Sequence, residues 1–587
     1  MSRSAAVAPA VRISLALAGL AWTLPFLVPY HTYPLAGFYG EWLAFALGLG
    51  AAALLLWPRA WQPLHLPAVA LAPFGLAVLV LLQWLLGRVT YTEQALTAAL
   101  YLLWMMTMMV LGGALRREIG IAGLAVALAW WLLAGGLLSA VVALLQRYQL
   151  HTFLDPLIAQ WGSGVPGNVG QPNHLANYIA LALASLAYLV AAGKLPRISA
   201  LALAPLLLFV MALTGSRSAW LYLLALVLLA LWFHRRAPSL DSRRLVISSM
   251  LLIAGFVLMQ WVASLQFTTH APDVFTSGQK LFESTGSYSS RLALWREAWS
   301  IFLQSPLLGA GFGQFAWQHF ELGVLGDKGQ LPYNYAHNIV MHLLAETGLT
   351  GALIVLAGVV VWLAGLKRLE TGLHGWWLLA LLAVLGIHSM LEYPLWYATF
   401  LGIAALLLGA GATRFVVLEE RGISRIAIAA TLALGSFVTA TTMESYRELE
   451  RIVFEAHRSK AAVPAEPEFA EMLMRIHRES LLTPYVEYAL SSALVPDRDR
   501  LKDKLDLNAR VMHFYPAADV VYRHALLLAL NGERAAALVQ LHRAMTMYPD
   551  TRENYTRTLE MLAPRFPGTF EPLLEFVHTR TDSSAKR

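Results

Sequence analysis

The chain has 587 residues, of which 58% are hydrophobic and only 13% are charged. Soluble domains carry about 25% charged residues, so this composition excludes an ordinary soluble protein and indicates a membrane protein. The formal net charge of +7 is typical of basic cytoplasmic loops and contacts with lipid phosphates, rather than of nucleic-acid binding. Because the chain contains no cysteine, disulfides and thiolate metal sites are excluded.

Apolar runs of the length that crosses a bilayer, about 20 residues each, fill the first three quarters of the chain. They predict an all-α, polytopic bundle of about 12–13 spans, followed by a helical tail. The first run, Val11–Val28, has the length of a signal peptide, but the many runs after it favour a retained first helix. Residues 198–233 also fit a re-entrant pair around Gly215-Ser216-Arg217. The predicted spans are 11–30, 38–56, 67–87, 95–115, 120–145, 173–193, 198–214, 217–233, 245–265, 336–366, 375–390, 395–412 and 426–442.

The basic residues of the short loops predict how these spans are oriented. From Arg3 to Arg425 they fall in alternate loops, which the positive-inside rule places in the cytoplasm. The other loops, including the long loop 266–335, then face outside, and so does the tail from about Glu444. In a bacterial inner membrane this outside is the periplasm.

The distribution of charge predicts two domains, a transmembrane domain over 1–442 with its large periplasmic loop 266–335, and a periplasmic helical domain over 443–587. Within the second domain, Tyr522–Tyr548 has the pattern of a tetratricopeptide-type helix-turn-helix, with Asn531-Gly532 as the turn. A platform for a protein partner and a solvated helical cap are both open interpretations of this domain.

Polar residues gather in the outside loops and at the outside ends of the spans. A site built from loops over a helical bundle requires such groups of polar residues to meet on one face of the bundle. The candidate site residues are His31, Glu41, Gln171, Asn173, His174, Arg217, Arg291, Tyr335, His337, Asn338, His388 and Glu392.

Two arginines are candidates for binding an anion. Arg217 lies among apolar residues, where an arginine is costly and needs a partner, and its planar fork suits phosphate or carboxylate. The alternative for Arg217 is a buried ion pair with a glutamate, the candidates being Glu41, Glu346 and Glu392. Arg291 lies in a pattern typical of an amphipathic helix on the membrane surface, where it either holds a lipid phosphate or simply anchors that helix.

His337 opens the span 336–366 and is the candidate base, because a neutral imidazole accepts a proton from an attacking hydroxyl. The alternative is a histidine that hydrogen-bonds a neighbouring helix end. Asn338, His342 and Glu346 follow at helical spacing and are predicted to share one face. His342 and Glu346 are expected to pair and to hold a contact of the bundle.

The sequence offers little support for a cofactor. The glycine-rich loop 162–170 has no lysine at P-loop spacing, so nucleotide binding is unsupported, and an anion-binding nest and a flexible loop both remain open for it. The chain has no HExxH motif, and no acidic cluster that would hold a divalent cation lies near His337 in the sequence. We therefore expect a reaction without metal or cofactor.

An ordered set of motifs resembles the O-antigen ligase/polymerase (Wzy_C) superfamily of membrane glycosyltransferases. Three further motifs resemble the bacterial protein O-oligosaccharyltransferases of PglL type within it. The superfamily motifs are Gly-Ser-Arg217-Ser, Ser-Ser-Arg291-Leu, Ser305-Pro-Leu-Leu-Gly309 and Tyr335-Ala-His337-Asn338, and the further motifs are His31-Thr-Tyr-Pro34, Gln171-Pro-Asn173-His174 and His388-Ser-Met-Leu-Glu392.

The resemblance implies an oligosaccharide donor linked to undecaprenyl diphosphate and an acceptor hydroxyl on Ser or Thr of a periplasmic, pilin-like protein. Arg217 and Arg291 would then neutralise the departing diphosphate, His337 would orient or deprotonate the acceptor, and direct displacement would invert the sugar. The rivals are an O-antigen ligase acting on lipid A core, a Wzy-type glycan polymerase, and a transporter of the lipid-linked glycan. The groups of polar residues lie on only one side of the membrane, which disfavours the transporter.

Overall fold

The protein is described here by a computed structural model that covers residues 8–60, 62–159, 164–265, 286–322, 333–368, 372–459 and 467–585. Helices dominate this part of the chain, as predicted, and the two short strands pair antiparallel. The helices before the tail are α1 (Pro9–Ala21), α2 (Phe38–Leu56), α3 (Leu71–Leu85), α4 (Thr92–Arg147), α5 (Pro172–Ala191), α6 (Arg197–Leu213), α7 (Ser218–Arg236), α8 (Leu240–Ser264), α10 (Gly286–Gln304), α11 (Phe315–Leu322), α12 (Ile339–Leu363), α13 (Leu373–Ser389), α14 (Ala398–Gly411) and α15 (Arg421–Ser459), and the strands are β1 (Leu64–Pro67) and β2 (Phe415–Leu418).

The predicted membrane spans correspond to helices of the structure. In the described residues, nine helices are long and apolar enough to cross a membrane, and α6, α13 and α14 are shorter apolar helices. The 56 residues of α4 would measure about 84 Å if straight, far more than a bilayer requires. Its backbone leaves helical geometry at Gly120 (φ 70°), which divides α4 into the two spans predicted over 95–115 and 120–145.

Helix α5 lies at the centre of the bundle and carries two of the predicted site residues at its start. Within its apolar window 94% of the residues are buried, and its neighbours include α4, α6, α7 and α13. Small residues let membrane helices approach closely, since packing rather than water exclusion joins them. At the α4–α14 contact, a Cβ on Gly112 would lie 2.1 Å from the Leu406 carbonyl oxygen, so only glycine fits.

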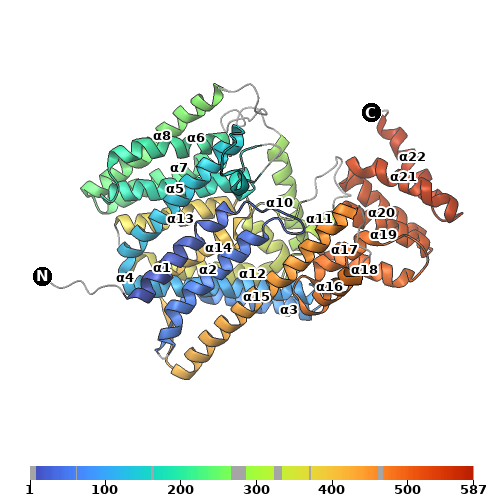
Figure 1. Ribbon diagram of the computed structural model, residues 1–587, viewed down its shortest axis with the longest axis horizontal. Coiled ribbons are helices and arrows are strands. Elements are labelled where there is room, and N and C mark those ends of the chain that lie inside the picture. Colours follow the sequence, from blue (N-terminus) through green and yellow to red (C-terminus); the bar gives the residue numbers. More distant parts are fainter. Residues whose placement is uncertain are drawn as a thin grey trace.

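Helix α15 joins the bundle to the tail as one continuous helix of 39 residues, and Figure 1 shows it running obliquely across the bundle toward α16. Only 6% of its apolar window is buried. The C-terminal half of α15 is anchored to α2, because the Tyr446 ring stacks on the Phe38 ring with their centroids 3.6 Å apart. The predicted boundary at 442/443 lies inside this helix, and the division into two domains stays a prediction.

The tail is a group of short helices beside the bundle, and the predicted helix-turn-helix is present in it as α19 and α20, with Gly532 (φ 84°) in the turn. Trp317 and Phe320 of α11 belong to the same apolar core as these helices, so the segment before His337 packs directly on the tail. The tail helices are α16 (Pro467–Glu479), α17 (Thr483–Ala493), α18 (Leu501–Phe514), α19 (Ala518–Leu530), α20 (Arg534–Met547), α21 (Arg552–Leu562) and α22 (Glu571–Ala585).

Candidate active site

Glu392 lies at the centre of a polar cluster that joins four segments distant in the sequence. Its Oε1 accepts hydrogen bonds from Arg291 Nη2 on α10 and from Asn173 Nδ2 on α5, both at 2.8 Å. Its Oε2 accepts from His337 Nδ1 at 2.9 Å. The Glu392 side chain is only 2% exposed, against 16% for His337 and 29% for Arg291. A buried carboxylate therefore holds two partly exposed groups, one on each oxygen.

The charge of Glu392 is stabilised by these partners. Burial by itself would raise its pKa, but the hydrogen bond from His337 and the charges of His337 and Arg291 outweigh burial and lower the pKa of the carboxyl to about 2. Glu392 lies three residues after the end of α13 at Ser389, and its backbone N–H donates to the His388 carbonyl at 2.8 Å. Glu392 is thus a fixed anion at neutral pH.

The backbone aims His337 at this anion. His337 has a positive φ of 50°, a left-handed conformation that is uncommon for residues other than glycine and that costs about 1–3 kcal/mol. An ionised carboxylate only accepts hydrogen bonds, so His337 Nδ1 carries a hydrogen, and in the neutral ring Nε2 then presents its lone pair. This tautomer is the one that a general base at Nε2 requires.

Arg217 lies at the start of α7, in the position that precedes the first helical residue. The positive φ of Gly215 (64°) turns the chain between α6 and α7, and the start of a helix carries partial positive charge. Arg217 is partly exposed, while its neighbour Ser216 is buried with an Oγ that has no hydrogen-bond partner among the described residues. The expected role of Arg217 in anion binding stays a prediction.

A buried pair of histidines lies next to the Glu392 cluster. His174 Nδ1 and His388 Nε2 share a hydrogen bond of 2.8 Å, and His388 Nδ1 lies 2.8 Å from the Tyr222 hydroxyl on α7. His174 Nε2 and Gln171 Oε1 are buried and have no hydrogen-bond partner within the described chain. These contacts tie α5, α7 and α13 together immediately beside Asn173 and Glu392.

Aromatic rings cover the cluster on another side. The Tyr335 ring stacks on Tyr393 at 4.3 Å and also contacts Trp396 at 5.6 Å. Tyr393 lies edge-on to His337 at 5.2 Å and to His174 at 5.6 Å. Tyr335, predicted as a site residue, therefore reaches His337 through Tyr393.

Asn338 does not share the helical face predicted for it, because it precedes α12 in an extended conformation and its Oδ1 accepts from the Val340 and Met341 N–H groups as the helix cap. His342 and Glu346 do pair, with Nε2 and Oε2 3.3 Å apart. Glu346 also accepts from the Gly313 and Phe315 N–H groups and so caps α11. This arrangement agrees with the structural role expected for the pair.

His31 and Glu41 lie apart from the Glu392 contacts. His31 places its ring nitrogens 3.0 Å from the Ala36 carbonyl and 2.8 Å from the Asn168 carbonyl. Glu41 accepts from the Ala398 N–H at 2.6 Å, at the start of α14, and from the Tyr101 hydroxyl at 3.1 Å. Substrate contacts at these two positions stay predictions.

Sequence reasoning missed Tyr222 and Tyr393 as members of the cluster. Tyr222 lies in an apolar run and gave no signal of its own. It lies one helical turn after Ser218, which follows Arg217 directly, and this spacing was the only hint in the sequence. Tyr393 adjoins Glu392 in the chain, and this adjacency was the available signal.

Known proteins resemble this chain in three consecutive segments. Residues 166–190 match a family described as protein glycosylation ligase, 201–356 match O-antigen ligase, and 376–560 match the C-terminal part of a virulence factor membrane-bound polymerase. Each segment contributes to the cluster, with Asn173 in the first, Arg291 and His337 in the second, and Glu392 in the third.

Two curated relatives come from Acinetobacter baylyi (strain ATCC 33305 / BD413 / ADP1). A general O-oligosaccharyltransferase is 28% identical over 397 residues, which cover 67% of this chain and 68% of the relative. A ComP-specific O-oligosaccharyltransferase is 23% identical over 275 residues, 47% of this chain and 48% of that relative. The chain is therefore a multi-pass membrane glycosyltransferase that is similar to O-antigen ligases and to the protein O-oligosaccharyltransferases of PglL type.

Proposed function

We propose that this protein transfers an oligosaccharide en bloc from undecaprenyl diphosphate to Ser or Thr hydroxyls of a periplasmic, pilin-like protein. The observation that carries the proposal is the pair of contacts on Glu392, which holds a potential base, His337, beside a cation, Arg291. Transfer from a diphosphate needs a base for the acceptor hydroxyl and a cation for the leaving diphosphate, and the Glu392 contacts bring these two functions together. The site and the tail would face the periplasm of a bacterial inner membrane.

In this proposal His337 Nε2 takes the proton of the acceptor hydroxyl while the hydroxyl oxygen attacks the anomeric carbon. The bond from that carbon to the diphosphate oxygen breaks, and its electron pair leaves with the diphosphate. Glu392 holds the ring in the correct tautomer and stabilises the imidazolium that forms, as the carboxylate does in a Ser-His-Asp triad. Attack opposite the leaving group inverts the anomeric centre.

Arg291 and Arg217 would stabilise the charge that grows on the leaving diphosphate. Arg291 gives one N–H donor to Glu392 and keeps further donors of its five for an anion. The donor diphosphate would therefore add hydrogen bonds to an Arg291 side chain that Glu392 already holds in place, so little reorganisation would be needed.

The tail would present the acceptor protein, since it packs on α11 close to the segment that carries His337. A deletion that begins after Ser459 tests this proposal better than one from Ser445, because it keeps the Tyr446 ring on Phe38 and the bonds of Glu450 to Thr32 and Tyr39. We expect it to impair acceptor use more than donor binding. Equal loss of both would contradict the proposal.

The proposed activity is tested by co-expressing the protein with a lipid-linked glycan pathway and a candidate pilin. The expected result is a mass increase of one glycan on the pilin, which His337→Ala abolishes while the variant remains folded and inserted. Transfer at the wild-type rate by His337→Ala would refute the assignment of the base. Glycan on lipid A core, or longer lipid-linked glycan, would instead favour the ligase or the polymerase to which the chain is also similar.

A further inference from the structure

A buried tyrosine of α7, Tyr222, has no part in the proposed transfer reaction, although its hydroxyl lies among the polar residues around the candidate site. The hydroxyl is 2.8 Å from Nδ1 of His388, and both side chains are fully buried. Nε2 of the same His388 ring is 2.8 Å from Nδ1 of His174 on α5. One imidazole ring at the end of α13 therefore contacts α7 with one nitrogen and α5 with the other.

These two contacts form one chain of hydrogen bonds. In a neutral imidazole one nitrogen donates and the other accepts, so His388 donates in one of the contacts and accepts in the other. Within the described chain His174 Nε2 has no hydrogen-bond partner, so the chain of bonds ends at His174. Loss of the Tyr222 hydroxyl would leave His388 Nδ1 without this partner in a buried place, which is costly.

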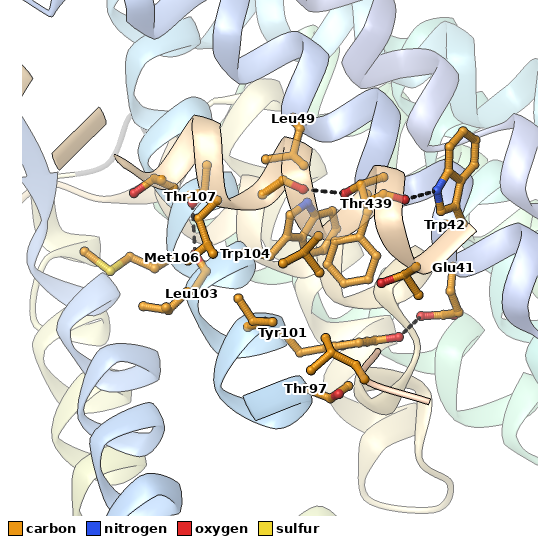
Figure 2. Close-up of a pocket in the computed structure, with 18 of the residues that line it drawn as sticks. Glu41, Trp42, Leu49, Thr97, Tyr101, Leu103, Trp104, Met106, Thr107 and Thr439 are labelled. Atoms are coloured by element: carbon orange, nitrogen blue, oxygen red, sulfur yellow. Dashed lines mark hydrogen bonds between the residues drawn. The ribbon is translucent and has the colours of Figure 1, made fainter. Parts of the chain in front are cut away.

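A single polar contact between two helices has particular weight in a membrane bundle. Because lipid tails are as apolar as the helices, close packing and hydrogen bonds between helices hold the bundle together. Figure 2 shows such contacts in the wall of an apolar pocket, where Tyr101 of α4 donates to Glu41 of α2 and Trp42 of α2 donates to the Thr439 carbonyl of α15. Tyr222 makes the corresponding contact between α7 and α13.

The contact of Tyr222 with His388 joins the segments that carry the two arginines of the site. Tyr222 lies five residues after Arg217, a rise of about 7.5 Å along α7. On the other side, the His388 carbonyl accepts from the Glu392 N–H at 2.8 Å. The Glu392 carboxylate in turn accepts from Arg291 at 2.8 Å. The start of α7 is therefore held against the carboxylate that holds Arg291.

We propose that Tyr222 is a positioning residue that fixes Arg217 relative to Arg291, so that both arginines reach the same donor diphosphate. The inference rests on the proposed function, in which the two arginines neutralise the leaving group, and it adds what sets their relative position. Without the hydroxyl, the start of α7 is distributed over several positions, and only one of them suits the donor. The apparent affinity for the diphosphate then falls by the fraction of protein in that position.

The test compares two tyrosines that contact the same helix. Tyr222→Phe removes the hydroxyl and keeps the ring. The matched control is Tyr188→Phe, because the buried Tyr188 of α5 places its hydroxyl 2.7 Å from Nδ1 of His374. His374 lies at the other end of α13, 14 residues from His388, which is about 21 Å along the helix. Each variant loses one contact between a hydroxyl and an imidazole, but only Tyr222→Phe loses it beside Glu392.

The dissociation constant for undecaprenyl diphosphate is measured with purified protein in lipid nanodiscs without any acceptor, and the KM for each substrate is measured in the transfer assay. A buried hydrogen-bonding group left without a partner costs about tenfold in an equilibrium constant, so Tyr222→Phe is expected to weaken diphosphate binding about threefold to tenfold. The KM for the donor rises as well, whereas the KM for the acceptor protein stays at the wild-type value. Tyr188→Phe keeps the wild-type value of all three constants.

A second comparison combines Tyr222→Phe with Arg217→Ala. Changes that act through the same group are not additive, so Tyr222→Phe is expected to cause no further loss of binding once Arg217 is absent. A further loss by the full factor, an equal loss in Tyr188→Phe, or an equal rise in the KM for the acceptor protein overturns the proposal.

The binding measurement also separates this inference from the proposed function. Weaker binding of undecaprenyl diphosphate by Arg217→Ala together with wild-type binding by Tyr222→Phe refutes the positioning role and leaves the proposed function intact. Wild-type binding by Arg217→Ala contradicts the proposed function at Arg217, and the positioning role of Tyr222 fails with it.

Discussion

Replacing Glu392 by glutamine tests the central feature of the site, because it removes the charge and keeps the shape. The carboxylate accepts three hydrogen bonds, from Arg291, Asn173 and His337. A glutamine offers one accepting oxygen, and its NH₂ group faces a donor. At least one of the three partners therefore loses its acceptor in a buried place, which is costly.

The size of the effect follows from the pKa of Glu392. The pKa falls from 4.5 to about 2, and each unit corresponds to about 1.4 kcal/mol, so the site favours the ionised carboxylate by about 3.5 kcal/mol. If the transition state loses this amount, kcat/KM for glycan transfer falls about 300-fold. Glu392→Asp keeps the charge on a shorter side chain and should recover part of the activity.

The assay is the initial rate of glycan addition to the acceptor protein, followed by intact mass with purified enzyme in lipid nanodiscs. Glu118→Gln is a suitable control, since Glu118 pairs with Arg59 in a partly exposed place far along the chain from the site residues. We expect this control to retain wild-type transfer. A folded Glu392→Gln variant with wild-type kcat/KM would refute the view that this carboxylate positions His337 and Arg291.

Three further predictions concern the second arginine, acid stability and the tail. Arg217→Lys should weaken binding of the diphosphate donor by at least about tenfold, because lysine lacks the planar fork; donor affinity equal to the wild type would show that a point charge suffices. The pKa of Glu392 is lower in the folded protein than its ordinary value, so its contribution to stability is present above pH 4.5 and is lost as the pH falls toward about 2. The thermal midpoints of wild type and Glu392→Gln should therefore converge over this pH range, and a difference that persisted at the acid end would contradict the linkage. Trp317→Ala should destabilise the contact of α11 with the tail core by about 3–5 kcal/mol, seen as a lower thermal midpoint than that of the exposed-site control Met561→Ala; equal midpoints would disprove the contact's contribution.

Local pattern was sufficient for the helices and for several local pairs. The apolar runs predict the spans because a bilayer forces each crossing segment into a helix of about 20 apolar residues. The i, i+4 spacing of His342 and Glu346 predicts their contact, since one helix carries both residues. The turn at Asn531-Gly532 follows from the left-handed conformation that glycine accepts.

Predictions made from helical spacing were wrong where the backbone departs from helical geometry. Asn338 was expected on the face of His342, but it caps α12 from an extended conformation. His337 depends on the same departure, since its left-handed φ sets the direction of the ring. Periodicity assumes a continuous helix and gives no information about such a position.

By itself the sequence determined the all-helical membrane class and indicated most of the polar residues that meet around Glu392, although not Tyr222 and Tyr393. Only the tertiary structure decided that Glu392 stands between Arg291 and His337, because those contacts join residues up to 101 positions apart in the chain. The packing of four segments, not any local propensity, brings the two oxygens of one carboxylate to two different partners.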